Sequence, residues 1–226
     1  MNNINTENRS VQILSTGVRL EGTISIPDAP KGLVIFVHGS GSSQRSPRNQ
    51  YVAQILQDGG LATLLFDLLT VTEETIDLRT RYLRFDVDLL ARRTTGVLEW
   101  LDLQPFAYEL KRGLFGASTG AAAALIAAAE LPEKVGAVVS RGGRPDLADE
   151  ALAKVQTPTL LIVGGDDKAV IDLNEQALAQ MQPETDKKLI VVPGASHLFE
   201  EAGTLEQAAK LARDWFLAHL SPVSVR

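Results

Sequence analysis

Ser118 lies in a setting that predicts a nucleophile. Residues 116–120 read Gly-Ala-Ser-Thr-Gly, after the apolar pair 114–115 and before an alanine-rich run over 121–129. A strand that turns sharply into a helix crowds its turn residue, and glycine on either side of Ser118 relieves that crowding. The free N–H groups and the dipole of the helix start favour negative charge there. A serine that merely caps a helix would look similar, so the motif needs partners elsewhere in the chain.

A serine hydroxyl needs a base beside it, because it hardly ionises at neutral pH. The chain has three histidines. His38 begins a loop after a different strand, and His219 lies in the terminal helix, where a solvated residue is the simpler interpretation. His197 follows an apolar strand in a Gly-Ala-Ser-His loop and is therefore the candidate base. The base in turn needs a carboxylate, and both Asp166 and Asp167 follow a preceding strand.

A serine nucleophile also needs backbone donors for the oxyanion that forms on attack. The first expected donor is the N–H of Thr119, directly after the nucleophile, and the second is the N–H of Ser40 in a His-Gly-Ser-Gly loop. Gly39 keeps that backbone accessible and is expected to line the substrate site. A flexible turn would read similarly, whereas a Walker-type phosphate loop is disfavoured because its Gly-Lys-Ser/Thr ending is absent.

Two arginines follow another strand end. Arg141 is expected to contact substrate, and with Arg144 it could clamp a substrate carboxylate in a bidentate manner. The alternative is that they neutralise local acids, Asp146 being the nearest in sequence to Arg144.

Composition limits the class of protein. The 226 residues are 45% hydrophobic and 22% charged, which suits one well-buried globular domain. A net charge of −6 argues against nucleic acid or an anionic membrane as partner. The absence of cysteine excludes disulfides and thiolate chemistry, and it agrees with a cytoplasmic location. We expect no secretory signal and no membrane span, a flexible tail over 1–9 and a single domain over 10–221.

Strand and helix patterns alternate along the chain. The predicted hairpin covers 11–14 and 18–26, and continuous apolar runs predict buried parallel strands. Over 68–77 we expect a surface stretch, followed by one long helix. The expected further strands are 33–37, 61–66, 114–115, 135–140, 159–163 and 189–192, and the expected helices are 47–56, 80–103, 121–129, 170–181 and 205–220. This alternation predicts a mostly parallel sheet covered by helices on both faces.

The candidate residues all follow strand ends. In a doubly covered parallel sheet the ligand crevice lies beyond the carboxyl ends of the strands. Ser40, Ser118, Asp167 and His197 each follow a different predicted strand, so the fold would bring them together.

These motifs, in this order, resemble the α/β-hydrolase superfamily, and within it the small dienelactone hydrolase-like branch that has no lid domain. The resemblance extends over about 11–220. It implies an α/β-hydrolase fold with an eight-stranded sheet, an inverted second strand, and Ser118, Asp167 and His197 as catalytic triad. The spacing Gly164-x-x-Asp167-x-x-Val170 favours Asp167 over Asp166 as the acid. Dienelactone hydrolases proper carry a cysteine nucleophile, whereas this chain has Ser118, so an ordinary ester, thioester or lactone is the expected substrate.

The sequence therefore predicts a serine hydrolase of small carboxylic esters that needs no cofactor and no metal. Two alternatives stay open. One is a binding module that holds a small ligand in the same pocket without turnover. The other is an acyltransferase or perhydrolase that passes the same acyl group to a different acceptor. The oligomeric state is open between a monomer and a homodimer.

Overall fold

A mixed sheet of eight strands forms the centre of the protein. The computed structural model describes residues 6–222. The spatial order of the strands is β1-β2-β4-β3-β5-β6-β7-β8. Among the described strands β2 runs antiparallel to both of its neighbours, β1 and β4, and every other pair is parallel, so the inverted second strand is confirmed. The strands are β1 (Thr6–Ser15), β2 (Val18–Pro27), β3 (Leu33–Val37), β4 (Ala62–Phe66), β5 (Arg112–Ala117), β6 (Ala137–Arg141), β7 (Thr159–Gly164) and β8 (Lys187–Val192).

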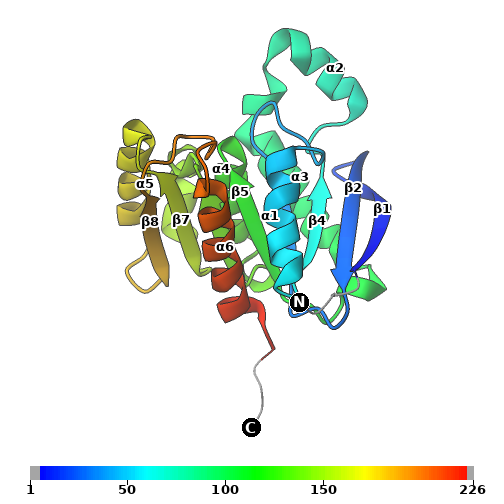
Figure 1. Cartoon of the computed structure of the whole chain (residues 1–226). Coiled ribbons are helices and arrows are strands. Elements are labelled where there is room, and N and C mark those ends of the chain that lie inside the picture. The colour runs from blue at the N-terminus through cyan, green and yellow to red at the C-terminus, as the bar shows by residue number, and fades with distance from the viewer. Residues whose placement is uncertain (1–5, 223–226) are drawn as a thin grey trace.

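Helices cover both faces of this sheet (Figure 1). Helices α1 (Pro47–Asp58) and α6 (Thr204–Leu220) pack on one face, and α3 (Val87–Leu101), α4 (Thr119–Glu130) and α5 (Lys168–Gln180) on the other. Helix α2 (Val71–Thr80) projects beyond the sheet at the end where β4 finishes. Short 3-10 segments complete the chain: η1 (Leu83–Phe85), η2 (Pro105–Ala107), η3 (Pro132–Lys134) and η4 (Pro145–Lys154).

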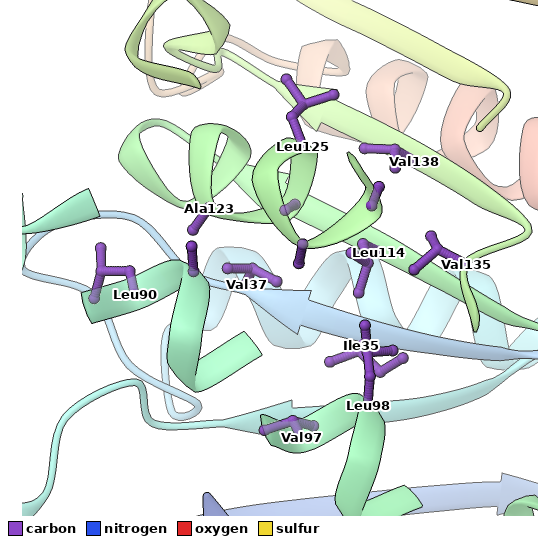
Figure 2. Close-up of a cluster of buried hydrophobic side chains, with 14 of the residues drawn as sticks. Ile35, Val37, Leu90, Val97, Leu98, Leu114, Ala123, Leu125, Val135 and Val138 are labelled. Carbon is purple, nitrogen blue, oxygen red and sulfur yellow. The ribbon is translucent and has the colours of Figure 1, made fainter. Parts of the chain in front are cut away.

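Each face of the sheet has its own hydrophobic core. Figure 2 shows one of them, where Ile35 of β3 and Leu114 of β5 meet Leu98 of α3. The alanines of α4 between 121 and 128 are almost completely buried, and their small side chains let this helix lie close to the sheet. The close packing of α4 fixes the position of Ser118, because this helix begins directly after that residue. The central strands are buried on both faces, as their continuous apolar runs predicted.

The segment between β4 and α3 differs from the prediction. Residues 71–80 form α2 instead of a surface stretch, and the predicted helix over 80–103 begins only at Val87. Thr70 and Glu73 form a capping box that starts α2. Arg81 ends it in the left-handed conformation, with φ of 54°. Asp86 then starts α3 by accepting a hydrogen bond from the Leu89 N–H at 2.9 Å.

The N-terminal strand begins earlier than predicted. Residues 6–9, which we assigned to a flexible tail, pair with residues 24–27 of β2, because β1 continues the hairpin ladder to Thr6. The rest of that expected tail, residues 1–5, lies outside the described residues. Within residues 6–222, no helix combines the length and the apolar character needed to cross a bilayer.

Candidate active site

Ser118 occupies a strained turn between β5 and α4. Its φ of 50° and ψ of −124° lie outside the common regions for a residue with a side chain. The Ser118 carbonyl accepts hydrogen bonds from the N–H groups of Arg144 at 3.0 Å and Ala121 at 3.1 Å, which hold the strained peptide. A Cβ on Gly120 would come 2.1 Å from the Val37 carbonyl oxygen, so only glycine permits α4 to begin this close to β3.

His197 is joined to Asp167. Its Nδ1 lies 2.6 Å from Asp167 Oδ2, and the side chains are 38% and 16% exposed. An ionised carboxylate can only accept a hydrogen bond, so Nδ1 carries the proton and Nε2 keeps its lone pair. Asp167 comes from the end of β7 and His197 from the loop after β8. The structure therefore joins two side chains that lie 30 residues apart in the sequence.

The two adjacent aspartates have different surroundings. Asp167 stands at the N-cap position of α5, but its carboxylate turns to His197 and makes no capping bond. The Asp166 side chain is exposed, and only its N–H is tied down, to the Ala195 carbonyl at 3.0 Å. Asp167, and not Asp166, takes the cap position of α5.

The loop after β3 lies against the nucleophile turn. The Ser40 N–H donates to Thr119 Oγ1 at 3.1 Å, which links the two residues whose backbone N–H groups we expect to face an oxyanion. As the first residue of α4, Thr119 has an N–H without an intrahelical partner. A Cβ on Gly39 would lie 2.9 Å from the Ala117 carbonyl oxygen and 3.0 Å from Ser118 Cβ. Glycine at 39 is therefore what allows this loop to approach Ser118.

His38 has a structural role in the same loop. Its Nδ1 donates to the Gly39 carbonyl at 2.9 Å, and its Nε2 accepts from the Leu68 N–H at 3.0 Å. Both ring nitrogens are thus occupied by backbone groups, and only the neutral imidazole fits them. Burial lowers the pKa of His38, which favours the same neutral form. His38 is therefore committed to positioning the loop, and His197 stays the candidate base.

A cleft of about 530 Å³ collects most of the candidate residues. Gly39, Ser40, Ser118, Arg141 and His197 all line it. No hydrogen bond joins Ser118 Oγ to His197 in the part of the chain that the structure describes. Asp167 lies behind His197 and contributes through it.

The two candidate arginines, Arg141 and Arg144, have different partners in the structure. Arg144 forms a bidentate pair with Asp146, with contacts of 2.9 and 2.7 Å, so the predicted clamp does not form from both. Arg141 lies at the end of β6, is 7% exposed, and has its guanidinium carbon 5.7 Å from the centre of the Phe199 ring. Burial, and then the charge of Arg48, lower its pKa to about 10. Of these two arginines, only Arg141 lines the cleft.

Three supporting features escaped the sequence analysis. Glu201 accepts a hydrogen bond from the Ser196 N–H at 2.9 Å and so braces the His197 loop; this bond lowers the pKa of Glu201. Phe199 is buried with φ of 56° and packs beside Arg141. The backbone bond from Arg144 to Ser118 is the third. The sequence could have indicated Glu201, because it is an acid four residues after the candidate histidine. The packing of Phe199 on Arg141 and the bond from Arg144 to Ser118 depend on tertiary structure alone.

The protein has an α/β-hydrolase fold. The fold is defined by the inverted second strand, the parallel strands that follow it and the sharp turn into α4. No lid domain interrupts it between residues 6 and 222. The chain belongs to the dienelactone hydrolase family, whose model matches residues 20–221.

Several known proteins are similar to this chain in sequence or in structure. The crystal structure of dienelactone hydrolase from Anabaena variabilis is 58% identical in sequence and covers 95% of this chain and 99% of its own, with a TM-score of 0.93. Est1E from Butyrivibrio proteoclasticus matches 92% of this chain and 98% of its own with a TM-score of 0.76, but it is only 16% identical and so supports the fold alone. A Mycobacterium tuberculosis protein named "Putative phosphoribosyl transferase" is 55% identical over 210 residues, which are 93% of this chain and 46% of that protein. The chain thus spans about half the length of its curated relatives.

Proposed function

We propose that this protein is a serine hydrolase that cleaves small carboxylic esters, including thioesters or lactones, through an acyl-enzyme on Ser118. The observation that carries the proposal is the 2.6 Å contact between His197 Nδ1 and Asp167, beside a strained serine in the same cleft. A module that only bound a ligand would have no need for an imidazole with a fixed tautomer next to such a serine.

The chemistry follows from the positions of the groups. Ser118 Oγ attacks the acyl carbon while His197 Nε2 takes its proton, and Asp167 stabilises the resulting imidazolium. The N–H of Thr119 receives the negative oxygen of the tetrahedral intermediate, and the N–H of Ser40 joins it by exchanging its bond to Thr119 Oγ1 for one to the oxyanion. His197 then protonates the leaving alcohol. Water, activated by the same imidazole, releases the acid and restores Ser118.

The cleft is open toward solvent, and α2, which projects beyond the sheet (Figure 1), contributes none of the residues that line it. Such a cleft has little apolar wall to bury a long acyl chain, so we propose short acyl groups as substrates. Rates with p-nitrophenyl esters should fall as the acyl chain lengthens, and a clear preference for long chains would contradict this.

Intact-protein mass spectrometry with a fluorophosphonate tests the proposal. The parent should gain one label, the Ser118→Ala variant none, and the His197→Ala variant should react far more slowly. His219→Gln provides a matched control, because His219 lies in α6, remote from the cleft, and should leave labelling unchanged. No labelling of the folded parent would overturn the proposal. A product analysis with added alcohol or peroxide separates hydrolysis from transfer to another acceptor.

The phosphoribosyl transferase name belongs to proteins about twice the length of this chain. It assigns no reaction to the half that matches. In that half, the proposed nucleophile and the His197–Asp167 pair support hydrolysis instead.

A further inference from the structure

The cleft beside Ser118 has an unusual charge for this protein. The whole chain carries a net charge of −6. The residues that line the cleft nevertheless include Arg45, Arg48 and Arg141, and no aspartate or glutamate is among them. Several serine hydroxyls and the Asn49 side chain complete the polar wall. Substrates that enter this cleft therefore meet a positive surface on an otherwise acidic protein.

Arg141 is a buried cation whose side chain meets no counter-ion among residues 6–222. Its Nε and Nη1 atoms are buried and have no hydrogen-bond partner. Its neighbours are the Phe199 ring and a second cation, Arg48, whose charge helps to lower the Arg141 pKa. Arg48 itself is held only by an exposed ion pair with Glu200 at 3.3 Å. A buried guanidinium is normally paired, so an unpaired one at a cleft wall points to an anionic ligand.

The N-terminus of α1 lies at the same wall. Ser46 stands at the N-cap without a side-chain capping bond, Pro47 follows it, and the first turn contains no acidic residue. The N–H groups of Arg48 and Asn49 belong to this turn and have no intrahelical acceptors. Free N–H groups and the positive end of the helix dipole form a common environment for phosphate groups.

We propose that this wall of the cleft is a subsite for a phosphate monoester group carried by the ester substrate. The inference rests on the proposed hydrolysis, since it names the substrate class of the same site. Two guanidinium groups that repel each other, together with a helix N-terminus, match two negative charges better than one. A phosphate monoester carries nearly two charges at neutral pH and offers three acceptor oxygens. A carboxylate would leave part of this surface unneutralised.

Binding of inorganic phosphate tests the subsite independently of catalysis. Isothermal titration calorimetry of the full chain at pH 7.5 should show one site for phosphate and much weaker binding of acetate. Arg141→Met should weaken phosphate binding by about tenfold or more, and Arg141→Gln should do the same, as expected from losing a charge-assisted pair. Arg144→Met is the matched control, because Arg144 is paired with Asp146, and it should keep the parent affinity.

Hydrolysis supplies the second arm of the experiment. Two esters with the same acyl group, one with a phosphate monoester on its alcohol and one without, should differ in kcat/KM in favour of the phosphorylated ester. Arg141→Met should lower that ratio. Equal phosphate affinity in the parent and Arg141→Met, or acetate bound as tightly as phosphate, would overturn the subsite. If phosphate binds but neither ester is cleaved and no fluorophosphonate label forms, the proposed hydrolysis fails and the subsite stands.

Discussion

Replacing Arg141 by methionine should make the folded protein more stable. Burial and the neighbouring Arg48 charge lower the pKa of Arg141 to about 10, between two and three units below that of a solvated arginine. Each pKa unit corresponds to about 1.4 kcal/mol, so the folded protein disfavours this charge by about 3 kcal/mol near neutral pH. The contact with the Phe199 ring returns about 1 kcal/mol, which the variant loses. The expected net gain in unfolding free energy is therefore about 2 kcal/mol.

The pH dependence has a defined sign. A cation whose pKa is lowered by folding destabilises the folded state wherever it is charged, so its cost is present at neutral pH and disappears only as pH rises above about 10. The comparison is best made by urea unfolding and thermal melting at pH 7.5 in a buffer without phosphate. A gain of about 2 kcal/mol corresponds to a rise of roughly 4–8 °C in Tm for a chain of this size.

The effect of added phosphate and the stability of Arg144→Met provide two further tests of this prediction. Phosphate should stabilise the parent more than Arg141→Met, since a ligand of the folded state adds about 1.4 kcal/mol at ten times its Kd. The stability gap should therefore narrow as phosphate is added. Arg144→Met should behave oppositely and lose up to about 1 kcal/mol, because it breaks the pair with Asp146. If Arg141→Met is less stable than the parent, Arg141 has a structural partner and the reasoning is refuted.

Other substitutions probe the nucleophile, its base and the adjoining loop. Asp167→Asn should lower kcat in an ester assay by about 10⁴, because it removes the carboxylate that fixes the His197 tautomer. The control variant Asp166→Asn, at the exposed neighbouring position, should keep a kcat close to that of the parent in the same assay. Gly120→Ala should reduce the unfolding free energy by about 3 kcal/mol or more, since its Cβ would meet the Val37 carbonyl at 2.1 Å; a normally stable variant in urea would contradict that packing. His38→Gln should keep fluorophosphonate labelling and lose about 1–3 kcal/mol at pH 7.5. Because burial lowers the His38 pKa, the contribution of His38 to the unfolding free energy is complete above pH about 6.5 and is lost as pH falls below that value. Between pH 7.5 and 5.5 the parent should therefore lose more unfolding free energy than His38→Gln.

The sequence indicated which strand ends would meet, but not the side-chain partners at those ends. Strands such as Leu33–Val37 were predictable because five large apolar residues in succession fit only a strand buried on both faces. The choice between Asp166 and Asp167 was different, since adjacent residues share almost the same local pattern. The turn after β7 decides it by exposing the first carboxylate and directing the second at His197.

The segment over 70–86 shows where periodicity misleads. Apolar spacing suggested one long helix from about residue 80, yet the left-handed Arg81 ends α2 and Asp86 starts α3 again. Local capping signals were present, because Thr70 and Glu73 have the spacing of a capping box. The break itself is held by a side-chain contact across it, the ion pair between the buried Asp77 and the half-buried Arg84 at 2.5 Å, which no helical pattern reveals.

Net charge describes the surface that a distant partner meets, while a bound substrate responds to the groups that face it. The value of −6 argues against nucleic acid as a partner, but it says nothing about a cleft whose lining holds arginines and no acids. Arg141 and Arg144 look alike in the sequence, three residues apart at the end of β6 and just beyond it. Folding pairs Arg144 with Asp146 and buries Arg141 unpaired at the cleft, so only Arg141 keeps free donors for a ligand. An unpaired buried charge costs stability, and a group of this kind is expected where binding a ligand offsets that cost.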